Sequence, residues 1–469
     1  MNSPRGELPR REFLRSAGLG LAGLAAAPSL PCFGQAQAGA SAAPNASTNC
    51  AGGGPRASFS VRDFGATGDG TTKDTAALQQ AIDRCWALGG REVVVPAGKY
   101  LTGALALRSN TTLRLEKDAT LLGSPDLADY PVMQVRWEGK WIQGHVGLIY
   151  AVDAENIAIT GPGTIAGNEP LGGRPSAQDP LRRPALIEPM NCRNVRLEGF
   201  STSYRRMWSV HLTYCEQVHI RNLTIRSTGG NGDGIDVDSS RAVWIDGCDI
   251  STGDDCISLK SGRGSEANTL MRTTEDVHIS NCTFADSIFA CIGIGSETSG
   301  GIRGVTIDRC NFTGARTFAV YIKTRIGRGA FIEDISCTNL RVSGTKGGFL
   351  AINGTSSGLQ DQCPVAGDAG IPVLRNYRFA HVHVEDCPML VDATRIDATK
   401  PLDGFWLIDV TGTCTKGIYL ANTRHAGIRG VNVTGVSGAL LNIDNVTGAG
   451  LKGAATFNAA EFAKPRERQ

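Results

Sequence analysis

Two acidic turns, 21 residues apart, are the part of this 469-residue sequence best suited to chemistry. The first, residues 231–234, holds Asp233, and the second, residues 253–256, holds Asp254 and Asp255. That separation is too long for one strand but matches one coil of a β-solenoid, so the turns should stack on neighbouring rungs, roughly 4.7–4.9 Å apart. Carboxylates crowded that closely resist being charged together, so one should keep its proton to a higher pH than the others. The stretch therefore favours acid/base catalysis, such as a glycosidic bond requires.

A repeated phrase of short strands predicts the solenoid that would position these turns. Each copy has two apolar positions flanking a variable one, and the copies recur about every 23 to 38 residues. Short strands repeated at this period favour a solenoid over a sandwich. The copies begin at Asn156, Asn194, Gln217, Ala242, Asp276 and Gly304. After Ser343 they become less regular, and residues 358–371 are predicted to form a long loop between coils.

A short helix is predicted over residues 76–88, before the run of strands begins. It is amphipathic, with Leu78, Ile82 and either Cys85 or Trp86 on one face, and a pair of glycines follows it. A helix at this place would cap the stack, covering the end that otherwise exposes unpaired edge groups.

The first 57 residues are expected to lie outside the fold. Residues 1–38 combine paired arginines at 10 and 11, an apolar run at 17–30 and small residues at 36–38, which is typical of a twin-arginine export signal. An uncleaved anchor is the alternative, but the run is short and rich in glycine and alanine. Residues 39–57 indicate a flexible linker, which leaves residues 58–469 as the folded domain. A periplasmic or secreted bacterial protein is expected.

Composition excludes several classes of partner. The net charge is only +2, so bulk electrostatics imply neither nucleic acid nor a membrane surface as a partner. The 14 cysteines match no zinc-binding spacing, and neither a metal nor a cofactor is predicted. Aligned on the repeat, Leu223, Cys248, Cys282 and Cys310 occupy one position of successive coils, and Cys387 recurs later. Small buried hydrophobes are the favoured interpretation of these cysteines, with disulfides between neighbours left open.

Several ordered motifs together resemble the polygalacturonase family, glycoside hydrolase family 28. They are residues 66–70 before the capping helix, Asn231-x-Asp233, Gly253-Asp254-Asp255 and Ile322-Lys323. The likeness covers roughly residues 58–450. It implies an all-β, single-stranded, right-handed parallel β-helix of the pectin-lyase-like kind. It also implies inverting hydrolysis of α-linked uronic acid polymers, so a pectic polysaccharide or oligosaccharide would be the substrate.

The resemblance also implies roles for individual residues. Asp254 is similar to the family's general acid, and Asp233 and Asp255 are similar to the bases that hold the attacking water. An inverting enzyme needs its acid and base roughly 6.5–9.5 Å apart, which carboxyls on neighbouring rungs could meet. Lys323 is expected to hold a sugar carboxylate, and Arg325 could assist because guanidinium binds carboxylate in bidentate fashion.

Some residues near these motifs have two interpretations. Asn231 is a turn former or a substrate contact, and Arg328 is a substrate contact or a surface charge. Trp208 and His211, one coil before Asp233, could floor a sugar subsite or belong to the core. Asp236 and Asp238 fit ordinary strand alternation as well as they fit the site.

Departures from the family pattern bear on the substrate. The family's Gly-His-Gly motif falls on Phe289-Ala290-Cys291, Tyr321 replaces the Arg of Arg-Ile-Lys, and Gly232 replaces the middle Thr of Asn-Thr-Asp. Members that act on rhamnogalacturonan also lack the His, and exo-acting members differ in their rim loops. An exo-acting polygalacturonase-like hydrolase or a rhamnogalacturonan hydrolase is therefore expected. The remaining alternatives are a calcium-dependent pectate lyase and a non-catalytic carbohydrate-binding β-helix.

Overall fold

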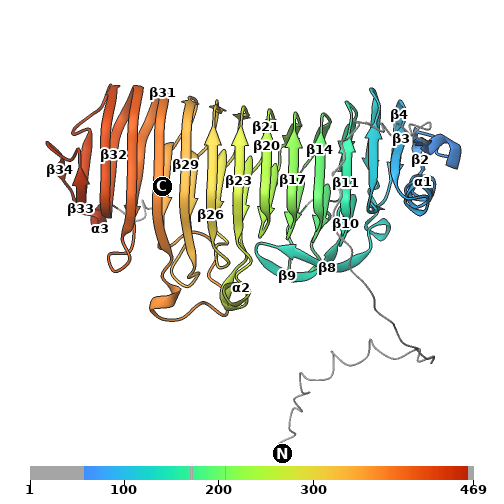
Figure 1. Cartoon of the computed structure of the whole chain (residues 1–469), viewed down its shortest axis with the longest axis horizontal. Helices are drawn as coiled ribbons and strands as arrows, with labels where there is room; N and C mark the ends of the chain where they lie inside the picture. The colour runs from blue at the N-terminus through green and yellow to red at the C-terminus, as the bar shows by residue number, and fades with distance from the viewer. Residues whose placement is uncertain (1–57, 169–170, 172, 206, 463–469) are drawn as a thin grey trace, which may run out of the picture. The chain divides into compact units, whose positions relative to one another are not determined.

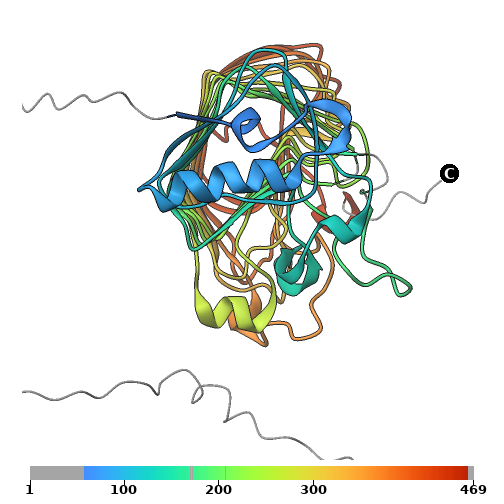
Figure 2. The same cartoon turned by 90° about the vertical axis from the view of Figure 1, so that its right-hand side faces the viewer.

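The computed structural model describes residues 58–168, 171, 173–205 and 207–462. The export signal and linker predicted over residues 1–57 lie outside the described residues. The described chain winds into coils, and each strand pairs in parallel with the equivalent strand of the next coil (Figure 1). Seen end-on, the coils superimpose around one shared core (Figure 2). The predicted all-β parallel β-helix is confirmed.

Each coil contributes a strand to each of three parallel sheets. The first sheet runs β1 (Ser58–Ser60), β3 (Arg91–Val95), β6 (Thr111–Leu115), β11 (Glu155–Thr160), β14 (Arg193–Glu198), β17 (Glu216–Arg221), β20 (Arg241–Asp246), β23 (Thr274–Ser280), β26 (Ile302–Asp308) and β29 (Phe331–Val342). The second runs β2 (Asp69–Lys73), β4 (Gly98–Thr102), β7 (Ala119–Gly123), β12 (Thr164–Ala166), β15 (Ser201–Tyr204), β18 (Thr224–Ser227), β21 (Asp249–Ser251), β24 (Thr283–Ala285) and β27 (Asn311–Phe312).

The third sheet carries the two acidic turns at its edge. It runs β5 (Leu105–Ala106), β10 (Ile149–Val152), β13 (Ile187–Met190), β16 (Val210–Thr213), β19 (Ile235–Asp238), β22 (Ile257–Lys260), β25 (Ile292–Gly295), β28 (Phe318–Lys323) and β30 (Gly348–Asn353). Longer strands then continue the stack: β31 (Val373–Arg395), β32 (Leu402–Thr434), β33 (Leu441–Ala449) and β34 (Ala455–Thr456). A short helix, α3 (Ala459–Phe462), follows them.

The repeated phrase of the sequence forms the first sheet. Its last apolar residue stacks in exact register from coil to coil, through Ile159, Leu197, Ile220, Ile245, Ile279 and Ile307. The first residue of every copy has a left-handed backbone, with φ between 54° and 65°. Asn, Asp and Gly adopt this conformation most readily, which explains why those types recur there. The phrase therefore encodes a backbone kink as well as a buried strand.

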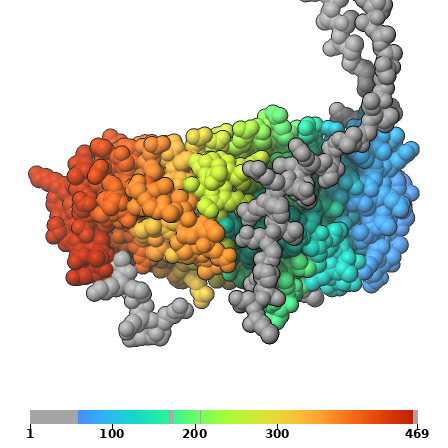
Figure 3. Space-filling model, turned by 90° about the horizontal axis from the view of Figure 1, so that it is seen from below, coloured from blue at the N-terminus to red at the C-terminus, as the bar shows by residue number. Residues whose placement is uncertain are grey.

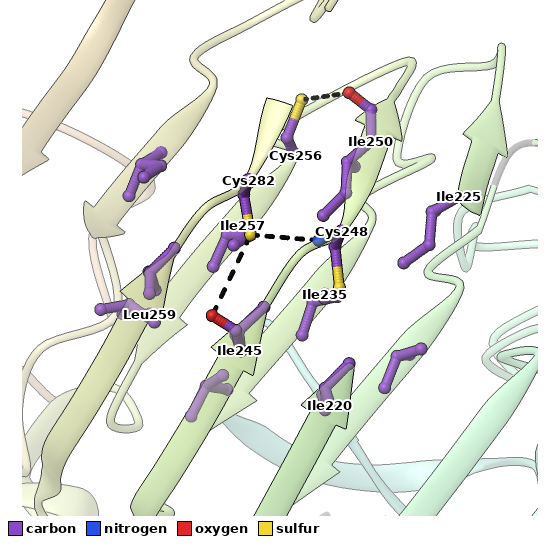
Figure 4. Packing of buried hydrophobic residues seen from close by; sticks show 14 of the residues in the cluster. Ile220, Ile225, Ile235, Ile245, Cys248, Ile250, Cys256, Ile257, Leu259 and Cys282 are labelled. Atoms are coloured by element: carbon purple, nitrogen blue, oxygen red, sulfur yellow. Dashed lines mark hydrogen bonds between the residues drawn. The ribbon is translucent and has the colours of Figure 1, made fainter. Parts of the chain in front are cut away.

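The cysteines of the repeat pack in the core as predicted (Figure 4). Cys248, Cys282 and Cys310 are buried in successive coils, and the backbone N–H of Cys248 donates to Sγ of Cys282 at 3.4 Å. Leu340 takes the next place in this column, because Asn311 pairs with Arg341. The assignment of Cys387 to the column was wrong, since Leu340 pairs with Val382 and Cys387 lies further along β31, beyond a register shift. All twelve described cysteines are free thiols.

Helix α1 (Thr75–Ala87) covers the N-terminal end of the stack, as predicted (Figure 2). It buries Leu78, Ala81, Ile82 and Cys85, whereas Trp86 is 52% exposed, so Cys85 and not Trp86 completes the apolar face. Asp74, just before the helix, accepts hydrogen bonds from the backbone N–H groups of Thr67 and Gly68. A 3-10 turn, η1 (Val61–Phe64), precedes these residues. Among the described residues no helix is long and apolar enough to cross a membrane.

Three insertions gather on one side of the solenoid (Figure 1, Figure 3). The first is an antiparallel hairpin, β8 (Val132–Trp137) and β9 (Lys140–His145), which follows the 3-10 turn η2 (Leu127–Asp129). The second contains helix α2 (Gly264–Leu270). The third is the predicted loop after β30, residues 354–371, which includes the 3-10 turn η4 (Asp368–Gly370). The last two follow the C-terminal ends of strands of the third sheet, whereas the acidic turns precede the N-terminal ends of its strands.

Candidate active site

The coil structure brings the three predicted acidic residues together. Asp233 precedes β19, and Asp254 and Asp255 precede β22, which is the neighbouring strand of the third sheet. One carboxylate oxygen of each lies within 4.8 Å of the others. The sheet is held by inward residues such as Ile235 and Ile257, whose burial is complete. The acidic trio therefore rests on a rigid strand pair and a packed core.

The trio lies in a cleft of about 360 Å³ on the outer face of the third sheet. The cleft is rich in charge of both signs and has two aromatic side chains in its lining. Its lining residues are Glu138, Arg174, Trp208, Asn231, Asp233, Asp254, Asp255, Ser258, Lys260, Arg263, Phe289, Gly295, Ser296, Glu297, Lys323, Gly358 and Leu359.

Asp255 is held on both of its oxygens. Lys323, at the end of β28, donates to Oδ2 at 2.7 Å, and the backbone N–H of Ala290 donates to Oδ1 at 3.2 Å. The Lys323 ammonium also lies 4.3 Å from the ring centroid of Phe289. Burial raises the pKa of Asp255, and Lys323 offsets part of that rise. Asp255 is thus fixed in place beside a positive charge.

Asp233 has a different environment from Asp255. The Lys260 ammonium lies 3.5 Å from its Oδ2 and 2.7 Å from Asp236, and it sits 5.0 Å from the Trp208 ring. Oδ1 of Asp233 is buried without a hydrogen-bond partner. Burial, and then the charges of Asp236 and Asp254, raise the pKa of Asp233 well above its ordinary value, while Lys260 offsets only part. Asp233 therefore holds its proton to a pH above the ordinary range, with burial as the larger cause and the predicted crowding by neighbouring carboxylates as the second.

Asp254 is the most accessible carboxylate of the trio. It is half-buried, whereas Asp233 and Asp255 are buried. Its Oδ1 accepts the backbone N–H of Asp255 at 3.0 Å, and its backbone carbonyl accepts the hydroxyls of Thr252 and Ser287 at 2.7 and 2.8 Å. The turn is thus fixed through its backbone, and the carboxyl is left free to face a ligand in the cleft.

The substitution Asp233→Asn should stabilise the fold at neutral pH, whatever it does to activity. The pKa of Asp233 is raised in the folded state, so its contribution to stability is present at low pH and is lost as pH rises through the folded pKa. The neutral amide avoids that loss, so the free energy of unfolding at neutral pH should rise by a value on the order of 1 kcal/mol. Thermal unfolding from pH 4 to 8 should show a gain that grows with pH. A gain of equal size at both ends, or a loss at pH 8, would contradict the assigned environment.

A second buried charge network lies beside the trio, on the preceding strands β13 and β16 of the same sheet. Arg182 donates to both oxygens of Glu188 at 2.6 and 2.7 Å, and His211 lies 3.3 Å from Glu188. Burial works to raise the pKa of Glu188, but Arg182 and His211 outweigh it and bring the pKa to about 2. His211 therefore belongs to a buried charge network on the outer face of the third sheet, in register with Asp236, and not to the hydrophobic core. Trp208 lines the cleft, stacks on Trp137 at 4.9 Å and also packs in the hydrophobic core, so both interpretations hold for it.

The basic residues proposed as sugar contacts are not equally placed. Lys323 lines the cleft, but its ammonium is already bonded to Asp255. Arg325 is not among the lining residues and donates to the carbonyl of Gly358. Arg328 is fully buried and donates to the carbonyls of Ser296 and Leu359, so the surface-charge interpretation of Arg328 was wrong. Both arginines therefore support the loop that follows β30.

Asn231 is both a turn residue and a residue of the cleft. Its φ is 62°, which makes it a left-handed turn residue, and it also lines the cleft. Its side-chain oxygen accepts a hydrogen bond from Nε of Arg174. Asp236 and Asp238 belong to the charge network of the site, since they pair with Lys260 and with Arg136 at 2.7 and 3.1 Å.

Several site residues are absent from the sequence-based prediction. Lys260 is the most important, and strand alternation from Asp236 and Asp238 through the paired strand β22 could have found it. Gly293 is another: a Cβ there would meet Oδ2 of Asp255 and lie 2.8 Å from its Cγ. Glu138 and Arg263 come from the insertions, Arg174 comes from the connection between β12 and β13, and none of the three carried a local signal.

The three carboxylates are close enough for their oxygens to surround one small ligand. One oxygen of each lies within 4.8 Å of the others, whereas the spacing of roughly 6.5–9.5 Å in inverting glycosidases is measured between whole carboxyl groups. That grouping of oxygens would also suit a metal ion, but the ammoniums of Lys260 and Lys323 already lie 3.5 and 2.7 Å from Asp233 and Asp255. The absence of a metal stays a prediction.

A cleft with clustered carboxylates on the outside of a parallel β-helix defines a carbohydrate-active hydrolase as the class of this protein. Residues 85–359 match the model described as "Glycosyl hydrolases family 28". The chain belongs to that family, and it is a glycoside hydrolase.

Named relatives agree with the family match. The chain is 30% identical over 374 residues to a "Probable polygalacturonase" of Vitis vinifera, covering 77% of this chain and 74% of the relative. It is 29% identical over 302 residues to an "Exo-poly-alpha-D-galacturonosidase" of Dickeya chrysanthemi, covering 52% and 48%. A solved exopolygalacturonase from Thermotoga maritima aligns with a TM-score of 0.68 and 26% identity, covering 81% of this chain and 92% of that one.

Proposed function

We propose that this protein degrades pectin by releasing galacturonic acid-type units from chain ends with inversion at the anomeric carbon. The observation that carries the proposal is the acidic trio in a cleft that insertions wall off on one side. Similarity to polygalacturonases and to an exopolygalacturonase structure supports the substrate class.

In the proposed reaction Asp254 donates its proton to the glycosidic oxygen as the C–O bond breaks. The water held by Asp233 and Asp255 attacks the anomeric carbon from the opposite face and gives up a proton to one of them. The pKa of Asp233 is raised, so its ionised form is the stronger base for that transfer. In the reactive form the proton that the trio retains is therefore on Asp254 and not on Asp233. Lys260 and Lys323 hold the two bases at fixed positions.

The exo mode rests on what we call the cleft wall, made of residues 138–140, 261–273 and 354–371. Asp361, buried within it, pairs with Lys140 at 2.9 Å and with Arg263 at 3.5 Å. Arg263 also donates its backbone N–H to the carbonyl of Gly139, and Ser265 donates to that of Cys363. All three segments are thus tied to one another, which closes the cleft beyond the C-terminal ends of β22 and β30. A polymer could enter this side only by its end.

Recognition of the sugar carboxylate is assigned first to Arg174 and Arg263, and Lys323 contributes less because its ammonium is already bonded to Asp255. Arg174 and Arg263 line the cleft and share Glu138 as a partner at 3.2 and 3.6 Å. A substrate carboxylate can compete with one shared acid more readily than with the short bond between Lys323 and Asp255. Arg325 acts indirectly, by holding Gly358 at the rim.

A rhamnogalacturonan hydrolase of the same family is the second candidate. Ala290 is fully buried, so the position where the family carries His presents no side chain to the cleft, and Phe289 lines it instead. An apolar ring at this place would suit a deoxy sugar.

Product analysis tests both candidates. Polygalacturonate, its oligomers and rhamnogalacturonan are incubated with the protein, and the products are separated by size and their first-formed anomer is read by proton NMR. Single sugar units of β configuration, released while viscosity falls slowly, are expected from polygalacturonate. Mixed oligomers would contradict the exo mode, α-configured product would contradict inversion, and no release from any substrate would contradict the function.

We also propose that the protein is exported, with residues 1–38 as a twin-arginine signal, 39–57 as a linker and 58–469 as the enzyme domain. The paired arginines and the apolar run carry this proposal. N-terminal sequencing of the mature protein, with a start after Ala38 expected, checks it.

A further inference from the structure

A second groove, of about 390 Å³, lies on the solenoid outside the catalytic cleft. We define it as the outer groove, and its lining residues are Asp286, Ser287, Ile288, Gly314, Ala315, Arg316, Gly344 and Lys346. We propose that the outer groove binds the part of an acidic polysaccharide that extends out of the cleft, with Arg316 and Lys346 pairing with its carboxylates. The inference rests on the proposed function and names how a long substrate is held.

The outer groove adjoins the catalytic turn. Ser287, which lines the groove, donates its hydroxyl to the backbone carbonyl of Asp254 at 2.8 Å. Two residues later Phe289 lines the cleft, and the backbone N–H of Ile288 between them donates to the carbonyl of Thr252. One continuous stretch of chain therefore forms the border between the two hollows.

The outer groove also lies on the side of the cleft away from the wall. Its residues precede the N-terminal ends of β25, β28 and β30, as the acidic turns precede β19 and β22. The wall segments at 261–273 and 354–371 instead follow the C-terminal ends of β22 and β30. A chain whose end is held against the wall can leave across the acidic turns, which leads it to the outer groove.

The cations of the outer groove are spaced along the solenoid axis, from one coil to the next. Ser287, Ala315 and Thr345 form parallel bridges from coil to coil. The backbone N–H of Arg316 donates to Ser287, and that of Lys346 donates to Ala315, each at 2.8 Å. Ile288, Arg316 and Lys346 thus occupy one position of three successive rungs, roughly 4.8 Å apart. This repeat is comparable with the length of one sugar unit in a polymer.

The chemistry of the groove suits a uronic acid chain. Arg316 and Lys346 are exposed, and within the described chain neither forms an ion pair with an acidic side chain, unlike Arg174, Lys260, Arg263 and Lys323 of the cleft. Asp286 is the single acid of the lining. Ile288 is 43% exposed and offers an apolar step on which the face of a sugar ring can pack. Unpaired cations on an exposed surface are available to a polyanion.

The test compares substrate lengths. The double variant R316A/K346A should keep its kcat/KM on a galacturonate dimer within about twofold, since a dimer fits the cleft. On a hexamer kcat/KM should fall roughly tenfold, through KM and not kcat, and added salt should remove the difference from the wild type. The matched control R378A/K452A removes one exposed arginine and one exposed lysine that do not line the groove. Its kcat/KM should equal that of the wild type on both substrates.

Unchanged kinetics on the hexamer, or an equal loss on dimer and hexamer, would overturn the inference while leaving the proposed function intact. Failure of the proposed function is distinguishable, because the wild type would then turn over neither substrate. In that event the affinity for polygalacturonate is measured by calorimetric titration into the wild type and into R316A/K346A, which tests binding in the outer groove separately from turnover. Equal affinity, or no binding by either, would overturn it.

Discussion

Replacing Asp254 with Asn is expected to lower kcat by about 10³–10⁴-fold without disturbing the fold. The amide is isosteric with the carboxyl, and its oxygen can still accept the backbone N–H of Asp255. What it lacks is the proton that the leaving oxygen needs. Because Asp254 is the half-buried member of the trio, its loss should leave Asp233 and Asp255 in place.

Asp249→Asn is the matched control for this variant. Asp249 lies in β21 of the same coil, but its side chain is exposed and pairs with Arg226 at 2.7 Å. The activity of the Asp249→Asn variant should stay within about twofold of the wild type, since an exposed ion pair contributes little to stability. If Asp254→Asn kept more than a tenth of the activity, Asp254 would not be the acid.

The substitution Gly293→Ala should cost about 100-fold in activity or more, although no proposed chemical group is removed. Gly293 is paired with Ser258 and Tyr321 in the third sheet, directly under the cleft. A Cβ there would overlap Oδ2 of Asp255, the same atom that Lys323 binds, so the carboxylate must move and release its ammonium partner. Displacing a catalytic group by 1 Å is enough for a loss of this size.

Gly230→Ala provides the comparison for Gly293→Ala. A Cβ at Gly230 would meet nothing within 4 Å, although this residue lies three positions from Asp233 in the chain. Steady-state kinetics should therefore show near-normal activity for Gly230→Ala, and both proteins should give the circular dichroism of the wild type. Full activity in Gly293→Ala would mean that Asp255 is not held where a base must be.

The fold could be predicted because the same short sequence pattern recurs in successive coils. The left-handed residue and the buried strand recur in six copies of one phrase, and each copy lies beside the next in space. The prediction for Cys387 failed where this phase is lost, at the register shift within β31. The disulfides could not be decided from spacing, since stacked thiols and stacked disulfides give the same pattern.

The site could be predicted only in part, for a physical reason. Asp233, Asp254 and Asp255 lie in turns whose motifs are local, so one coil of sequence is enough to bring them together. Lys260 was missed because a lysine at the end of a strand usually points to solvent, and here paired carboxylates keep it buried. The contacts of Arg325 depend on residues 354–371, which are an insertion with no repeat to place them.

Buried free thiols are spread along the whole described solenoid. Eleven buried cysteines are distributed from α1 to β32, and Cys363 alone of those described is exposed. A buried thiol can react with a labelling reagent only when its own coil opens. The rate of labelling at each cysteine would therefore report the opening free energy of that coil. The solenoid thus carries its own set of probes, from which its cooperativity can be mapped without a single substitution.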